Sequence, residues 1–126
     1  MAKRILIIDD EKDMHVYLRT LFRKAGYETE VAATAADGLA KALAWRPHLV
    51  TLDLLMPRRS GIEVYQAIRS APETHDTPVV VLTGLASHEG LLRDLDALPR
   101  PQAIVEKPID RERFLGLVKS LIGEPA

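Results

Sequence analysis

The chain has 126 residues, of which 47% are hydrophobic and 28% are charged, and its formal net charge is −1. This length fits one domain with its own core, and the near-neutral charge offers no general attraction to nucleic acid or to an anionic membrane. Because cysteine is absent, disulfides, thiolate metal sites and thiol catalysis are excluded, and a metal ion would need oxygen or histidine ligands.

No segment of the sequence has the pattern of an export signal or of a membrane span. The first apolar run, residues 5–8, is shorter than a signal-peptide core or a membrane span, and acidic residues follow it directly. Repeats and interdomain linkers are absent, and only residues 123–126 have the composition of a tail. We therefore expect one domain over residues 1–126, located in the cytoplasm and without an output domain.

Short apolar runs alternate with stretches of helical periodicity along the chain. Residues 5–8 and 79–82 are apolar and rich in β-branched side chains, as buried strands of a parallel sheet should be, and residues 48–52 are interpreted in the same way. Residues 27–32 and 102–106 complete a set of five strands. The alternation is typical of an α/β fold with helices on both faces of a parallel sheet.

Five helices are predicted between and after these strands. The first covers residues 14–25 and stops at Gly26 in a left-handed conformation. Thr34 and Asp37 form a capping-box-like start of the second, whose inward side chains are Leu39, Leu43 and Ala44.

The last three helices cover residues 62–70, 87–98 and 110–122. Asp110 is the expected N-cap of the final helix, whose inward side chains are Phe114, Leu117, Val118 and Leu121.

Polar side chains stand where four of the apolar runs end. They are Asp9 with Asp10, Asp53, Thr83 and Lys107. In a right-handed doubly wound sheet, all of these positions lie at the carboxyl edge, where open α/β sheets place their chemistry. The sequence therefore predicts one shared site.

The predicted site combines three carboxylates with a hydroxyl and an ammonium group. Two carboxylates about 4 Å apart repel by about 4 kcal/mol at an effective dielectric constant near 20, and a divalent cation such as Mg²⁺ relieves this repulsion. A carboxylate beside such an ion can attack phosphorus while Lys107 and Thr83 contact the transferring oxygens. Taken singly, each residue also fits a structural role, as an acidic helix start, a strand cap or a turn former.

Four segments together resemble the receiver domain of two-component response regulators, over essentially the full length of the chain. They are residues 7–11, residues 52–57 with Ser60 and Gly61, residues 81–84, and residues 106–108. The resemblance, which is closest to single-domain receivers of the chemotaxis-regulator kind, implies a flavodoxin-like sheet with strand order 2-1-3-4-5 and five helices.

The resemblance also implies the role of each site residue. Asp53 would accept a phosphoryl group from a phosphohistidine, Thr83 and Lys107 would contact that group, and the bond between Lys107 and Pro108 would be cis. The Mg²⁺ ligands would be Asp10, Asp53 and the backbone carbonyl of Leu55, with Asp9 acting through water. The implied partners are a sensor histidine kinase or histidine phosphotransfer protein and an unidentified downstream protein, and neither nucleic acid nor membrane.

Two features depart from the family pattern. Ile104 stands where receivers usually carry an aromatic residue that rotates on activation, so we expect a Thr83 movement that is transmitted through packing of the helix 87–98. That helix has more leucines than one buried stripe requires. Either its core-facing side is broad, or a partner or second copy docks on the face that it forms with residues 102–106 and 110–122.

Two other functions compete with a signalling receiver. A small phosphohydrolase of the haloacid-dehalogenase kind also combines Asp, Thr, Lys and Mg²⁺, but such enzymes usually carry a second catalytic Asp where Leu55 stands. A pseudo-receiver that only binds partners would not need the complete pocket. We therefore expect a receiver that catalyses only its own phosphorylation and dephosphorylation, and no general enzyme activity.

Overall fold

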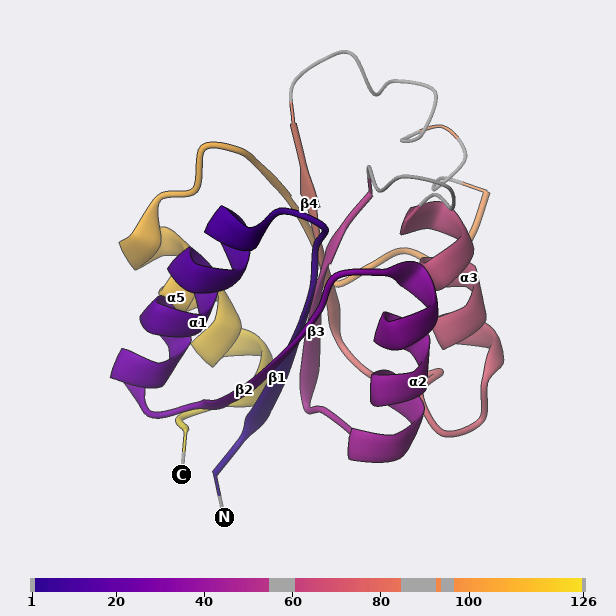
Figure 1. The fold of residues 1–126 in the computed structure, drawn as a ribbon, viewed down its shortest axis with the longest axis horizontal. Coiled ribbons are helices and arrows are strands. Elements are labelled where there is room, and N and C mark those ends of the chain that lie inside the picture. The colour runs from indigo at the N-terminus through magenta and orange to yellow at the C-terminus, as the bar shows by residue number, and fades with distance from the viewer. Residues whose placement is uncertain (1, 55–60, 85–92, 94–96, 126) are drawn as a thin grey trace.

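A computed structural model describes residues 2–54, 61–84, 93 and 97–125. Its centre is a parallel sheet of five strands in the order β2-β1-β3-β4-β5, which confirms the predicted topology (Figure 1). The strands are β1 (Arg4–Ile8), β2 (Glu28–Ala32), β3 (Leu49–Asp53), β4 (Val79–Thr83) and β5 (Ala103–Glu106).

Helices cover both faces of the sheet. Figure 1 shows α1 (Lys12–Ala25) and α5 (Arg111–Ile122) on one face, and α2 (Ala35–Trp45) and α3 (Gly61–Ser70) on the other. The structure gives bounds for these four helices, against five predicted. Most of the predicted helix 87–98 lies outside the described residues. Of its described positions, Arg93 is helical, whereas Ala97 and Leu98 form a turn and a bend.

The strands are buried on both faces because successive side chains point to opposite sides. Leu6, Ile8, Val50 and Leu52 belong to the core cluster beneath α2 and α3. A second cluster, beneath α1 and α5, takes the alternate positions of the same strands together with helix side chains: Ile5, Ile7, Leu49, Val80, Leu82, Leu18, Phe22, Phe114 and Val118. The uninterrupted apolar runs of the sequence thus reflect two cores that share one sheet.

The helix ends follow the predicted capping residues. Gly26 has φ 107°, and its backbone N–H donates to carbonyls of the last turn of α1. The Thr34 hydroxyl accepts from the Asp37 N–H at 3.1 Å, and the Asp110 side chain accepts from the N–H groups of Glu112 and Arg113. The sequence predicted all three helix ends correctly because capping is a local interaction.

The inward face of α2 agrees with the prediction only in part. Its buried residues are Ala35, Gly38 and Ala42. Leu39 and Leu43 are half-buried, Leu39 packs against the core as predicted, and Ala44 is exposed. A Cβ at Gly38 would lie 2.9 Å from side-chain atoms of Ile8, so the helix approaches β1 closely. The closest contact with β1 therefore admits only small side chains, which the prediction did not include.

The residues predicted as a tail are attached to the sheet. The Tyr27 hydroxyl donates to the Gly123 carbonyl at 2.8 Å, and the Lys3 backbone N–H donates to the Pro125 carbonyl at 2.7 Å. Burial, followed by the charge of Glu124, raises the pKa of Tyr27. The end of the described chain therefore packs against the amino edge of the sheet.

Thr51 has a buried hydroxyl that makes no hydrogen bond with the described residues. It lies in the middle of β3 and is 1% exposed. A Thr51→Val variant should therefore be more stable by about 1 kcal/mol, since a methyl group replaces a buried oxygen without a partner. Urea unfolding measures this change, and a loss of stability would indicate that the hydroxyl does have a partner.

Among the described residues, no helix combines the length and the apolar character that a membrane crossing requires.

Candidate functional site

The predicted site residues come together at the carboxyl edge of the sheet. Asp9 follows β1, Asp53 ends β3, Thr83 ends β4 and Lys107 follows β5. Because β1, β3, β4 and β5 are parallel neighbours, these chain positions meet at one edge. The bond between Lys107 and Pro108 is cis, as the resemblance implied.

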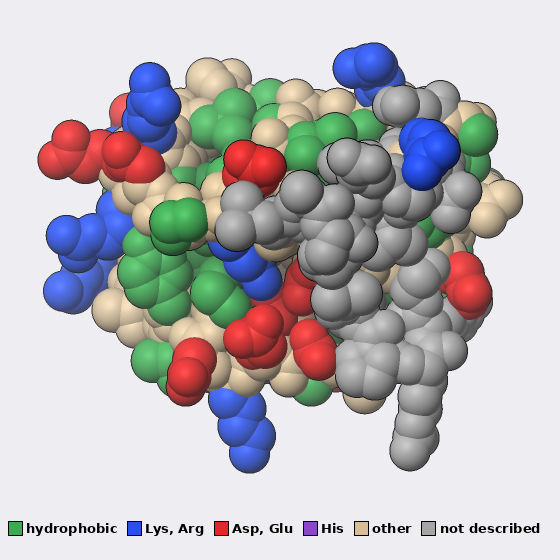
Figure 2. Space-filling model, turned by 90° about the horizontal axis from the view of Figure 1, so that it is seen from above, with side chains coloured by type: hydrophobic (Ala, Val, Ile, Leu, Met, Phe, Trp, Pro, Cys, Tyr) green, Lys and Arg blue, Asp and Glu red, His purple; other side chains and the backbone are tan. Residues whose placement is uncertain are grey.

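Four carboxylates form a cluster at this edge. Asp9, Asp10, Glu11 and Asp53 each offer an oxygen, and these oxygens all lie within 4.8 Å of one another. Figure 2, which looks onto this edge, shows acidic side chains gathered beside a basic one. Asp9 is 1% exposed and Asp53 is 4% exposed, so two of the carboxylates lack the solvation that would otherwise reduce their repulsion.

Lys107 is the cation of this cluster. Its Nζ atom lies 3.7 Å from Asp9 Oδ2, 3.8 Å from Asp53 Oδ2 and 3.9 Å from Glu11 Oε1. The Lys107 backbone N–H donates to the Thr83 carbonyl at 2.8 Å, which ties the lysine to the end of β4. One ammonium group therefore pairs with three of the four clustered carboxylates, and a second cation would reduce the remaining repulsion.

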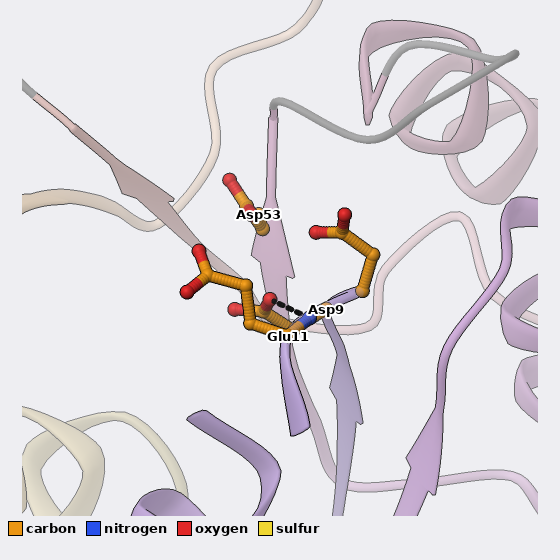
Figure 3. Close-up of side chains that lie close together, drawn as sticks. Asp9, Glu11 and Asp53 are labelled. Atoms are coloured by element: carbon orange, nitrogen blue, oxygen red, sulfur yellow. Dashed lines mark hydrogen bonds between the residues drawn. The ribbon is translucent and has the colours of Figure 1, made fainter. Parts of the chain in front are cut away.

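Asp9 is held by two hydrogen bonds, and its second carboxylate oxygen lies in the cluster. Its backbone N–H donates to the Ala32 carbonyl at 3.1 Å, and its Oδ1 accepts from the Glu11 N–H at 2.9 Å (Figure 3). Its Oδ2 is buried and has no hydrogen-bond partner among the described residues. A buried carboxylate oxygen without a donor, beside three further acids, fits a hard cation such as Mg²⁺ with its bound waters.

Thr83 lies at the site with its hydroxyl turned to its own chain. The hydroxyl donates to the Gly84 carbonyl at 3.0 Å, and the residue is 3% exposed. Val79 and Val81 of β4 belong to the core beneath α2 and α3, and alternation assigns Thr83 to that side of the sheet. The structure therefore brings Asp9, Asp10, Asp53 and Lys107 together. The Thr83 hydroxyl is instead hydrogen-bonded to the Gly84 carbonyl.

One predicted ligand is not tested, and two further residues join the site. Leu55, expected to supply a carbonyl ligand, lies outside the described residues. Glu11 joins the acidic cluster although no role was assigned to it, and the signal for this was its place directly after Asp9 and Asp10. His15 is buried beside Asp9, which its helical spacing of three and seven from Leu18 and Phe22 could have indicated.

A doubly wound parallel sheet with an acidic cluster and a lysine at its carboxyl edge is the arrangement expected of a receiver domain, and comparisons with known proteins agree. The family model described as "Response regulator receiver domain" matches residues 5–119. Protein Rrf1 of Nitratidesulfovibrio vulgaris is 35% identical, with 94% of this chain and 81% of that protein covered. The DNA-binding dual master transcriptional regulator RpaA of Synechocystis sp. and the response regulator MprA of Mycobacterium bovis are matched over only 48% and 47% of their own length.

Solved structures give the same fold. The chemotaxis protein CheY4 of Vibrio cholerae has a TM-score of 0.85 at 25% identity, with 96% of this chain and 99% of that chain covered. The receiver domain of the sensor histidine kinase PA1611 of Pseudomonas aeruginosa has a TM-score of 0.87 at 20% identity, with 98% and 100% covered. That domain is described with a magnesium ion coordinated in its active-site cleft.

The chain belongs to the response regulator receiver domain family. It is thus a receiver of two-component signalling, a class whose members interact with histidine kinases and bind Mg²⁺ at an acidic pocket.

Proposed function

We propose that Asp53 accepts a phosphoryl group from a phosphohistidine and that the resulting charge switches a protein-interaction surface. The observation that carries this assignment is the ammonium group of Lys107, 3.8 Å from the nearly buried carboxylate of Asp53. Of the clustered acids, Asp53 alone comes from β3 rather than from the segment after β1. It is also the acid of the segment that resembles the family's phosphorylation-site motif.

The proposed reaction is an in-line displacement at phosphorus. A carboxylate oxygen of Asp53 forms the new O–P bond, while the P–N bond to the donor histidine breaks and the imidazole leaves with the bonding electron pair. The leaving nitrogen is protonated from solvent. Lys107 lies where it can stabilise negative charge on the transferring oxygens, which is the main catalytic requirement of such a transfer.

The acids that would hold Mg²⁺ are Asp10 and Asp53 directly and Asp9 through water, together with the carbonyl of Leu55. A bound ion would neutralise phosphoryl oxygens during the transfer. The Oδ2 atom of Asp9 supports this assignment, because it accepts no hydrogen bond from the described residues and a water on a cation would donate one. The magnesium described for the PA1611 receiver gives further support.

Thr83 would take part after the transfer. Its hydroxyl donates to Gly84 in the described structure, so donation to a phosphoryl oxygen requires a change of partner. The phosphoryl group adds a charge of about −1.5 to −2, and a conformation in which Thr83 and Lys107 both contact it would become more populated. Transmission through the helix 87–98 remains part of this proposal, and those residues lie mostly outside the described part of the chain.

The remaining features of the proposal follow from this role. Residues 1–126 act as one receiver domain in the cytoplasm, with a sensor histidine kinase or histidine phosphotransfer protein as donor and a protein, rather than nucleic acid or membrane, as target. Ile104 is 45% exposed on β5, as a docking or homodimer surface there would require. The chain would catalyse only its own phosphorylation and dephosphorylation, since Leu55 supplies no general acid beside Asp53.

The test is phosphorylation by acetyl phosphate in the presence of Mg²⁺, followed by intact mass measurement. Wild type should acquire a single phosphoryl adduct and Asp53→Ala none. Asp76→Asn is the matched control, because Asp76 is an acid with a side chain that is 89% exposed. Equal adduct formation by wild type and Asp53→Ala would refute the assignment, and repeated phosphate release from a monoester would favour the phosphohydrolase instead.

A further inference from the structure

His15 is a buried histidine for which the proposed phosphoryl transfer has no use. It lies in the first turns of α1, and its backbone N–H donates to the Glu11 carbonyl at 3.1 Å. Its Nε2 atom makes a buried hydrogen bond with the backbone carbonyl of Asp9. Because a carbonyl oxygen can only accept, the imidazole carries a proton on Nε2 and donates it.

This hydrogen bond completes the attachment of Asp9. The N–H of Asp9 is bound to β2, its Oδ1 is bound by the Glu11 N–H, and its carbonyl is bound by His15. Glu11, the N-cap of α1, makes no side-chain capping hydrogen bond. The imidazole therefore links the body of α1, through a hydrogen bond, to the turn that carries Asp9 and Asp10.

The Asp9 carbonyl also governs the position of Asp10. The peptide unit between Asp9 and Asp10 is planar, so a hydrogen bond that fixes its oxygen fixes the direction in which the Asp10 Cα leaves the turn. One side chain on α1 thereby restrains the backbone on which two carboxylates of the cluster stand. Without that restraint, electrostatic repulsion would move the carboxylates apart when no cation is bound.

We propose that His15 is a positioning residue, which holds the Asp9–Asp10 peptide so that the carboxylates are arranged for Mg²⁺ before the ion binds. The inference rests on the proposed magnesium site and adds a residue outside the implied ligand set. His15 does not bind the ion. It acts on the ligands through the backbone, as a partner in the outer shell of a metal site.

Variants of His15 that differ in side-chain length test the hydrogen bond to the Asp9 carbonyl. In glutamine, the amide nitrogen is separated from Cβ by the same number of bonds as Nε2 in histidine, so His15→Gln keeps a donor at the same reach. His15→Asn ends one bond short, and His15→Leu has similar bulk without a donor. His75→Leu is the control, because His75 has an exposed ring that also contacts a backbone carbonyl, that of Pro72.

Each variant is titrated with Mg²⁺, and binding is monitored by the chemical shifts of backbone amides. Urea unfolding of each variant is measured separately, without Mg²⁺. We expect Mg²⁺ affinity to fall about tenfold in His15→Leu and His15→Asn, and to stay within about threefold of wild type in His15→Gln and His75→Leu. If His15→Leu does not fold, the Asn and Gln variants still decide the question. The loss of Mg²⁺ affinity should be larger than any loss that the change in the urea unfolding midpoint of the same variant would explain.

The outcomes separate this inference from the proposed function. If wild type binds Mg²⁺ and the Asn and Leu variants bind it equally well, the positioning role is wrong while the metal site stands. If the Gln variant loses as much affinity as the Leu variant, donation to Asp9 is not the cause and the inference is again overturned. If wild type itself binds no Mg²⁺, the proposed site fails and the inference fails with it.

Discussion

Replacement of Gly61 by alanine should destabilise the protein by about 3 kcal/mol, at the upper end of the range for overpacked positions. A Cβ at Gly61 would lie 2.5 Å from the Asp53 carbonyl oxygen and 2.5 Å from the Leu54 Cα. Both neighbours are backbone atoms, so no rotamer change can relieve the contact. Since α3 begins at Gly61, either the helix or the end of β3 must move.

Urea unfolding of Gly61→Ala measures this loss, and Gly116→Ala is its control. Gly116 lies in the interior of α5, and a Cβ there would meet nothing within 4 Å. That second substitution should stabilise the protein by about 0.5–1 kcal/mol, as glycine-to-alanine changes in open helix positions do. A Gly61→Ala variant as stable as wild type would show that the end of β3 yields easily, contrary to the close contact described.

Replacement of Lys107 by methionine should have two opposite effects on the site. The rate of Asp53 phosphorylation by acetyl phosphate should fall roughly a hundredfold, since one donor to the transferring oxygens is lost. Mg²⁺ affinity should rise severalfold, because the ammonium group near Asp9, Glu11 and Asp53 no longer opposes a second cation. Misfolding would lower both quantities, so the opposite signs identify an electrostatic effect.

The measurements are the rate of adduct formation by intact mass and a Mg²⁺ titration. Lys119→Met is the control, since the Lys119 amine pairs with Glu124 at 3.9 Å on the exposed surface and should affect neither quantity. Phosphorylation of Lys107→Met at the rate of wild type would remove Lys107 from the proposed mechanism.

Much of the fold was predictable because its signals are local. The strand runs 5–8 and 79–82 are each shorter by one residue than β1 and β4, and the stops and caps at Gly26, Thr34 and Asp110 were assigned correctly. The face of α2 was not predictable in this way. The orientation of α2 depends on how closely the helix packs against Ile8, which is a property of the packed structure and not of the helix sequence.

The site was predictable to the same extent and for a related reason. Strand ends in a parallel sheet share one edge, so the cluster around Asp53 and Lys107 followed from the order of the elements. His15 was missed as part of the site because its role depends on a hydrogen bond to a backbone carbonyl, which no residue pattern encodes. The partner of the Thr83 hydroxyl was likewise beyond sequence reasoning, since a rotamer decides it.

The most direct test of the account is a crystal structure of the protein with Mg²⁺ and beryllofluoride, a mimic of the phosphoryl group. We expect the beryllium on a carboxylate oxygen of Asp53, one cation among the carboxylates of Asp9, Asp10 and Asp53, and the Lys107 amine in contact with a fluorine atom. A beryllofluoride group on another residue, or a Lys107 amine directed away from the acids, would contradict the account.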